Sequence, residues 1–250
     1  MATDIVYFVR AGETNEELRH SIRSVAQNLP HGNIWIIGFR PTWLTGVRHV
    51  SFHQNGASKH TNVFNMWKSL GTNDDLPDRF ILMNDDFFVM QPMEEVPVLH
   101  QGDLTKYSHR RLGSTYLQRA VRTADALVKL GRVRSELLAY ELHIPFPVTR
   151  SLITPAMDAL ASVATSPLVL YNKRTWYGNF ARIGGTGPQM DCKISSDEAW
   201  AKFGGSKAIN DWPWLSTADA TMRYGRVGKY IKGRFPTPCR YEDPVRRSRV

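Results

Sequence analysis

The sequence has few cysteines and no long apolar run. Cys192 and Cys239 are its only cysteines, too few for a disulfide framework and without the paired spacing of a zinc site. No stretch of about 18 apolar residues could span a bilayer. The first residues, Met-Ala-Thr-Asp, lack the basic and apolar regions of a signal peptide. We therefore expect a soluble protein without a membrane span, in a reducing, cytoplasmic setting.

Charge is divided unevenly along the chain. A length of 250 residues with 42% hydrophobic content allows one large domain, or one domain with an added subdomain. Residues 1–103 hold 8 Lys and Arg against 12 Asp and Glu, a net charge of −4, whereas residues 104–250 hold 24 against 11, a net charge of +13. Such a basic half could attract nucleic acid, an anionic membrane surface or a phosphorylated substrate. Solvated helix faces also carry Lys and Arg without any partner.

Apolar segments in the first hundred residues alternate between strand and helix patterns. Strands are predicted at 5–9, 34–37, 47–52 and 80–83, and helices at about 15–29 and 61–70. The first helix has an apolar stripe, which consists of Leu18, Ile22, Val25 and Leu29. Strands joined by helical crossovers at this spacing predict a mostly parallel sheet with helices on both faces.

Beyond Pro92 the pattern becomes helical and then irregular. Helices are predicted at 112–130, at 133–140 and from Thr154 onward. Pro145 and Pro147 favour an extended chain, so His143 is presented from a rigid, non-helical segment. We predict an α/β core at 1–103, a helical insertion or acceptor region at 104–165, and a C-terminal part at 166–250 that completes the same domain.

The stretch from residue 79 to residue 93 contains the main candidate for a functional site. A short apolar run, Phe80 to Met83, predicts a strand buried on both faces, and it ends in Asn84, Asp85 and Asp86. A divalent cation that carries substrate phosphates would offset the repulsion and desolvation of two adjacent carboxylates. A simple turn is the alternative, because Asn and Asp favour strand ends. The apolar residues 87–89 that follow favour a site.

Several motifs, in the same order, resemble those of the Stealth family. The first two conserved regions resemble Asn15-Glu-Glu-Leu-Arg-His-Ser-Ile-Arg-Ser24, Trp35-Ile-Ile-Gly38, Pro41-Thr-Trp43, Phe64-Asn65, Arg79-Phe80 and Asn84-Asp-Asp-Phe87. The later regions resemble the segment around His143, Leu215-Ser-Thr-Ala-Asp219, and Phe235-Pro-Thr-Pro-Cys-Arg-Tyr-Glu242.

This resemblance implies a fold and a reaction class. Stealth proteins are sugar-phosphate transferases of capsule synthesis and lysosomal enzyme tagging, with a nucleotide-sugar-binding fold similar to GT-A glycosyltransferases. The chain also resembles small proteins of actinobacterial phages that are regarded as glycosyltransferases. A GT-A-like, Rossmann-like α/β fold with a helical insertion is therefore expected. The chain departs from the family where Val9-Arg-Ala-Gly12 replaces an acidic turn of the Val-Asp-Gly type.

The resemblance also suggests roles for individual residues. Asp85 and Asp86 are predicted to bind Mn²⁺ or Mg²⁺, with Asp86 and His143 catalytic. His143 could act as a general base, because histidine titrates near neutral pH, or it could bind a phosphate or be purely structural. The expected substrate-binding residues are Arg10, Gly12, Arg19, Arg23, Lys59, Asn62, Asn65, Asn84 and Asp219. Arg19 and Arg23 would bind phosphates through their planar guanidinium groups. A solvated helix face would explain either arginine taken singly, but the resemblance at both positions favours phosphate binding.

Together these observations predict a metal-dependent glycosyltransferase with a nucleotide-sugar donor. A UDP-sugar is the first candidate for the donor, and the acceptor would be a protein or glycan, such as a virion component in a host cytoplasm if the chain is phage-encoded. One alternative is a Stealth-type sugar-1-phosphate transferase. A second is a basic nucleic-acid-binding protein, which we rank lower because no known binding motif is present and the basic residues are scattered.

Overall fold

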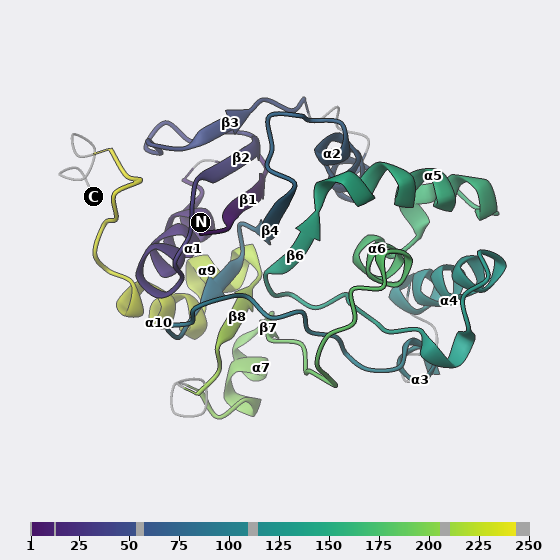
Figure 1. Cartoon of the computed structure of the whole chain (residues 1–250). Helices are drawn as coiled ribbons and strands as arrows, with labels where there is room; N and C mark the ends of the chain where they lie inside the picture. Colours follow the sequence, from purple (N-terminus) through teal and green to yellow (C-terminus); the bar gives the residue numbers. More distant parts are fainter. Residues whose placement is uncertain (1, 13, 54–57, 110–114, 206–210, 244–250) are drawn as a thin grey trace.

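The computed structural model describes residues 2–12, 14–53, 58–109, 115–205 and 211–243. Its central sheet has the strand order β3-β2-β1-β4-β6, in which β6 alone runs antiparallel to its neighbour (Figure 1). A smaller sheet has the order β5-β8-β7. The strands are β1 (Asp4–Val9), β2 (Ile34–Gly38), β3 (Arg48–Val50), β4 (Arg79–Asn84), β5 (Phe87–Val89), β6 (Phe146–Thr149), β7 (Lys193–Ile194) and β8 (Trp214–Thr217).

The described α-helices cover both faces of the central sheet. They are α1 (Glu16–Asn28), α2 (Lys59–Gly71), α3 (Leu104–His109), α4 (Thr115–Lys129), α5 (Ile153–Val163), α6 (Lys173–Ala181), α7 (Asp197–Lys202), α9 (Asp219–Tyr224) and α10 (Arg226–Arg234). Short 3-10 turns occur at Arg134–Glu136, Arg150–Leu152 and Leu168–Leu170. None of the helices in the described ranges is long and apolar enough to cross a membrane.

Alternation along the inner strands produces the two core layers. In β1, Val6 and Phe8 pack with the helices of the insertion, whereas Ile5, Tyr7 and Val9 pack with α1. The apolar stripe predicted for α1 lies in this second layer, and burial of each such side chain contributes roughly 1.5–3 kcal/mol. The α/β fold with a mostly parallel sheet, helices on both faces and a helical insertion is thus confirmed.

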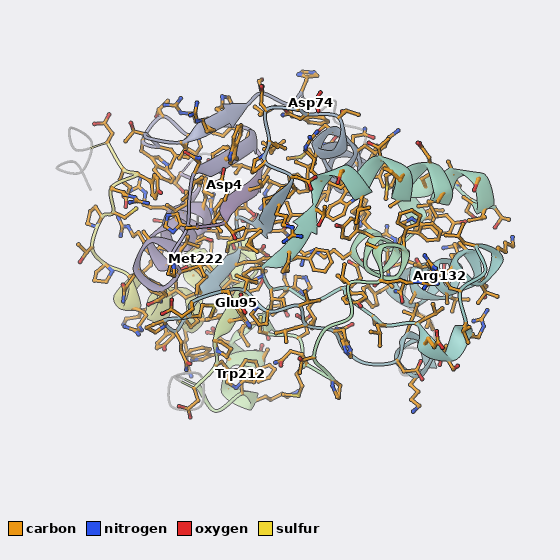
Figure 2. All side chains as sticks on the ribbon, in the orientation of Figure 1. Asp4, Asp74, Glu95, Arg132, Trp212 and Met222 are labelled. Carbon is orange, nitrogen blue, oxygen red and sulfur yellow. The ribbon has the colours of Figure 1, made fainter. Side chains whose placement is uncertain are left out.

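A third apolar cluster joins the small sheet to the C-terminal helices. Phe88 of β5 and Leu215 of β8 are fully buried against Met222, Val227 and Ile231 of α9 and α10. Figure 2 shows Met222 on one side of the molecule and Arg132 on the other, beside α4. Strand β5, which follows β4 directly, pairs with β8 in the small sheet, and this pairing fixes the position of the end of β4.

Some predicted elements are shorter or different in the structure. The strand predicted at 47–52 is only the exposed edge strand β3. The helix predicted at 133–140 is wrong: after Gly131, which has a positive φ of 84°, the chain forms a 3-10 turn and then continues without a helix. Residues 112–114 of the helix predicted at 112–130 lie outside the described residues. Pro147 lies in β6, at the edge of the sheet, where a missing backbone donor is tolerated.

Candidate functional site

A pocket of about 800 Å³ opens where β1 and β4 end. The strand order reverses here, because β2 lies on one side of β1 and β4 on the other. In open α/β sheets, ligands bind in the crevice at such a point, beyond the carboxyl ends of the strands. Phe8 lies opposite Asn84 in the parallel register, so Arg10 and Asp85, which follow these residues, both line the pocket.

Two of the aspartates that line the pocket have cationic partners. Asp86 accepts hydrogen bonds from Lys193 Nζ at 2.9 Å and from Ser216 Oγ at 3.2 Å. Asp219 forms an ion pair with Arg10. The chain itself therefore neutralises much of the charge on these two carboxylates.

Asp85 lacks such a partner. No described residue donates a hydrogen bond to its carboxylate. Burial in the pocket, and then the adjacent Asp86 carboxylate, raise the pKa of Asp85 to about 7, although Arg10 and Lys59 oppose the shift. The chain compensates a negative charge at Asp85 poorly, so a bound cation would stabilise it.

Glu17 is a fourth acid, buried beside these aspartates at the start of α1. Its Oε1 accepts a hydrogen bond from Thr217 Oγ1 at 2.9 Å. Burial, and then the hydrogen bond with Asp219, raise the pKa of Glu17 to about 8. The same hydrogen bond lowers the pKa of Asp219. At neutral pH, Glu17 therefore carries the proton that this pair shares.

The pKa of Glu17 predicts how stability depends on pH. Glu17 ionises near 4.5 in the unfolded chain and near 8 in the folded protein, so between these values the folded state binds the additional proton. The free energy of unfolding of the metal-free protein then falls as pH rises through this window. Glu17→Gln should have no effect at about pH 4 and should stabilise by about 1–2 kcal/mol at about pH 9, because Asp219 offsets part of the effect.

Thermal unfolding at both pH values checks this expectation. Glu95→Gln, at an exposed position, serves as the control for loss of a carboxylate. If the stability of wild type and of Glu17→Gln changed equally with pH, Glu17 would be ionised in the folded protein throughout this window, and the expectation would be wrong.

His143 lines the same pocket from the segment ahead of β6. Its Nδ1–H donates to Asp191 Oδ2 at 2.8 Å, and its backbone N–H donates to Oδ1 at 3.1 Å. Burial opposes ionisation of Asp191, but the hydrogen bond and charge of His143 lower the pKa of Asp191 overall. Because a carboxylate only accepts, this contact places the proton on Nδ1 and leaves Nε2 able to accept one.

The structure brings most of the predicted substrate-binding residues to this pocket. Lys59 and Asn62 line it from the first turns of α2, and Asn84 lines it from the end of β4. Gly12 lies next to it, in a smaller hollow of about 190 Å³ that also contains Arg10 and Asp219. Asn65 is half-buried on α2 and does not line the pocket.

Arg19 and Arg23 lie elsewhere, in a hollow of about 390 Å³. Arg23 donates to both carboxylate oxygens of Glu242, at 2.7 and 2.8 Å, and to the carbonyl oxygens of Phe235 and Pro236. The guanidinium of Arg19 lies 4.6 Å from the ring centroid of Trp43. The hydrogen bonds of Arg23 hold the C-terminal segment against α1, so its guanidinium is engaged away from the pocket at the ends of β1 and β4.

Sequence patterns gave no indication of three residues that shape the site. Asp191 and Lys193 come from the irregular region near the small sheet, and each binds a residue that was predicted. Arg174 of α6 is buried, and its Nη1 donates to Leu142 O at 2.8 Å and to Ile144 O at 2.9 Å. Arg174 therefore fixes the backbone on either side of His143.

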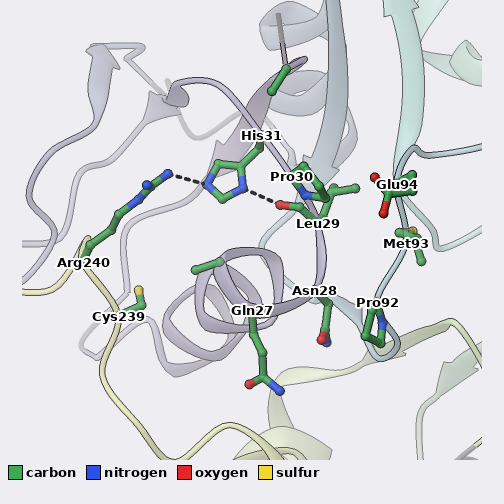
Figure 3. A pocket seen from close by; sticks show the side chains of 12 residues that line it. Gln27, Asn28, Leu29, Pro30, His31, Pro92, Met93, Glu94, Cys239 and Arg240 are labelled. Carbon is green, nitrogen blue, oxygen red and sulfur yellow. Dashed lines mark hydrogen bonds between the residues drawn. The ribbon is translucent and has the colours of Figure 1, made fainter.

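A second hollow, of about 780 Å³, lies beside the C-terminal end of α1. Figure 3 shows its His31 side chain between Arg240 and Leu29. The His31 Nδ1–H donates to Leu29 O at 2.7 Å, and Arg240 Nη2 donates to Nε2 at 3.2 Å. Both ring nitrogens of His31 thus have partners, whereas the pocket at the ends of β1 and β4 gathers Asp85, Asp86 and Asp219 and is the stronger candidate.

The side chains of the pocket that could bind a metal ion are mainly carboxylates. No group of three or more His, Cys, Asp or Glu side chains within the described ranges is arranged to hold a metal ion. Mg²⁺ commonly binds through one or two carboxylates together with substrate phosphates and water. Asp85, with Asp86 next to it, fits this smaller ligand set.

Comparison with models of known protein families gives no match, and no curated protein matches the sequence. Among solved structures, the chain is similar to the galactosyltransferase LgtC in complex with donor and acceptor sugar analogues. The identity is 11% and the TM-score 0.46, over 95% of this chain and 98% of the other. Likeness at this level carries no conclusion about activity. Membership of the Stealth family and the relation to phage proteins stay predictions.

Proposed function

We propose that this protein is a glycosyltransferase that moves a sugar from a nucleotide-sugar donor to a protein or glycan acceptor. One observation carries the proposal: the unpartnered carboxylate of Asp85 and the oriented imidazole of His143 line one pocket at the switch point of a parallel sheet. A UDP-sugar is the first donor to test. We also propose a reducing, cytoplasmic setting, because Cys192 and Cys239 are free thiols.

The pocket offers groups for both ends of the reaction. Lys193 would bind the donor phosphates, with Asp86 holding it in place. Asp85 and Asp86 would hold a Mg²⁺ or Mn²⁺ ion. When bound, such an ion would offset the negative charge that develops on the leaving diphosphate.

His143 would act on the acceptor. Nε2 takes the proton of an acceptor hydroxyl, and the resulting oxygen nucleophile attacks the anomeric carbon of the donor sugar. The bond between that carbon and the phosphate oxygen breaks, and the nucleoside diphosphate leaves with the electron pair. Asp191 stabilises the imidazolium that forms and keeps the ring oriented through Nδ1.

Titration calorimetry with UDP, GDP and CDP, with and without Mn²⁺, tests this proposal. We expect metal-dependent binding of one nucleotide, and Asp85→Asn should weaken it by about tenfold or more. Asp75→Asn, at an exposed position, is the matched control. Asp86→Ala is less informative, because it also releases Lys193.

Failure of every nucleotide to bind under both conditions would contradict the proposal. Strongly salt-dependent binding to unrelated DNA duplexes would then favour the nucleic-acid hypothesis. If a nucleotide does bind, product analysis separates the two transferase reactions. Release of a nucleoside diphosphate indicates sugar transfer, and release of a monophosphate indicates transfer of a sugar 1-phosphate.

A further inference from the structure

Three helices bring basic side chains to one wall of the pocket. Lys59 and His60 come from the first turn of α2, Arg119 from α4, and Lys173 from the first position of α6. Arg119 Nη1 donates to His60 Nδ1 at 3.1 Å, so the imidazole is neutral and holds the guanidinium in place. We refer to Lys59, His60, Arg119 and Lys173 as the basic wall.

The charges of the basic wall are poorly balanced by the chain. Within the described residues, no ion pair involves Lys59, Arg119 or Lys173. Burial lowers the pKa of Lys173; Glu141 opposes this shift and Arg119 adds to it. Burial, and then Arg119, Lys173 and Lys59, lower the pKa of His60.

Glu141 is the acid that acts on the charge of Lys173, and its carboxylate is already engaged. Its Oε1 accepts the backbone N–H groups of Arg174, at 2.9 Å, and Thr175, at 3.2 Å. Glu141 thereby satisfies two free donors at the start of α6. It reduces the repulsion around Lys173 without forming an ion pair with it.

An unpartnered amide lies beside the basic wall. Asn172 precedes Lys173, lines the same pocket and is 5% exposed. Among the described residues, its side-chain Nδ2 has no hydrogen-bond acceptor. A buried polar group without a partner is unusual in a folded protein and requires an explanation. An anion in the pocket would supply the acceptor.

We propose that Lys59, Arg119, Lys173 and the amide of Asn172 form a subsite that binds a phosphate group of a substrate. Arginine and lysine bind phosphate oxygens through charge-assisted hydrogen bonds, and a phosphate carries enough charge to balance several cations. The subsite deepens the proposed function, on which its role in transfer rests. The phosphate belongs either to the donor diphosphate or to a phosphorylated acceptor.

Titration of inorganic pyrophosphate into the metal-free protein tests the subsite. Arg119→Gln and Lys59→Gln should each weaken binding by about tenfold or more. Lys129→Gln, which removes an exposed charge from the same helix as Arg119, should bind like wild type. Thermal unfolding of each variant confirms that it is folded. Wild-type affinity in both Arg119→Gln and Lys59→Gln would overturn the proposal.

A second titration, with UDP and Mn²⁺ at saturation, identifies the source of the phosphate. Loss of pyrophosphate binding assigns the subsite to the donor, whereas unchanged binding assigns it to a phosphorylated acceptor. The two proposals fail separately. If no nucleotide binds but pyrophosphate binding still requires Arg119, the subsite stands and the transferase proposal fails. If a nucleotide binds but pyrophosphate binds equally well in wild type, Arg119→Gln and Lys59→Gln, the transferase proposal stands and the subsite fails.

Discussion

Asp85→Asn should reduce sugar transfer by about 10²–10³-fold. The substitution keeps the shape of the side chain and removes the one pocket aspartate whose charge the chain leaves unpaired. Asp86 cannot substitute for it, because its carboxylate is bound to Lys193 and Ser216. The loss should fall on turnover, because the charge that develops on the leaving diphosphate is no longer compensated.

Release of nucleotide from the donor identified by titration measures this effect. Asp75→Asn should retain wild-type turnover. The melting temperature of Asp85→Asn should not fall, because burial and Asp86 disfavour the ionised carboxylate in the folded protein. A turnover within about twofold of wild type, well short of the expected loss, would exclude Asp85 from the reaction.

The core of the fold followed from local patterns. Ile5 to Val9 and Phe80 to Met83 are continuous apolar runs, and runs of this kind form strands buried on both faces. The stripe on α1 repeats at helical spacing, so its buried face was predictable too. The lengths of other elements depend on tertiary contacts that local patterns do not reveal. For example, β3 lies at the sheet edge, pairs with only one neighbour and is shorter than predicted.

The candidate site was only partly predictable. Asp85 and Asp86 stood out because two acids directly follow a buried strand, and the sheet topology then placed Arg10 beside them. Arg19 and Arg23 were predicted through the family resemblance, yet Arg23 binds Glu242, which lies 219 residues away along the chain. A pairing over that distance leaves no local pattern. The same holds for Asp191.

The basic wall could not have been found from spacing. Its members come from the starts of α2 and α6 and from the N-terminal half of α4, and each alone resembles a solvated basic residue on a helix. Only the pocket shows that they lie together and that no described acid pairs with them. The uneven charge of the two halves indicated an anionic ligand, but not where it binds.

His143→Gln should lower turnover by about 10²–10⁴-fold, the usual contribution of a general base. Glutamine is close in size but cannot take the proton of the acceptor hydroxyl. Nucleotide affinity should change little, because His143 acts on the acceptor. Asp191→Asn should cause a smaller loss, because the base remains while the group that orients Nδ1–H and stabilises the imidazolium is gone.

Rescue by a conservative variant distinguishes positioning of His143 by Asp191 from a purely structural role. Asp191→Glu keeps a carboxylate that can accept from the Nδ1–H of His143, so it should recover part of the turnover that Asp191→Asn loses. A loss of packing alone would lower turnover in both variants. His53→Gln, at an exposed position, is the control for loss of an imidazole and should match wild type in turnover. Wild-type turnover in His143→Gln would show that the acceptor proton leaves by another route and that the contact between His143 and Asp191 is structural only.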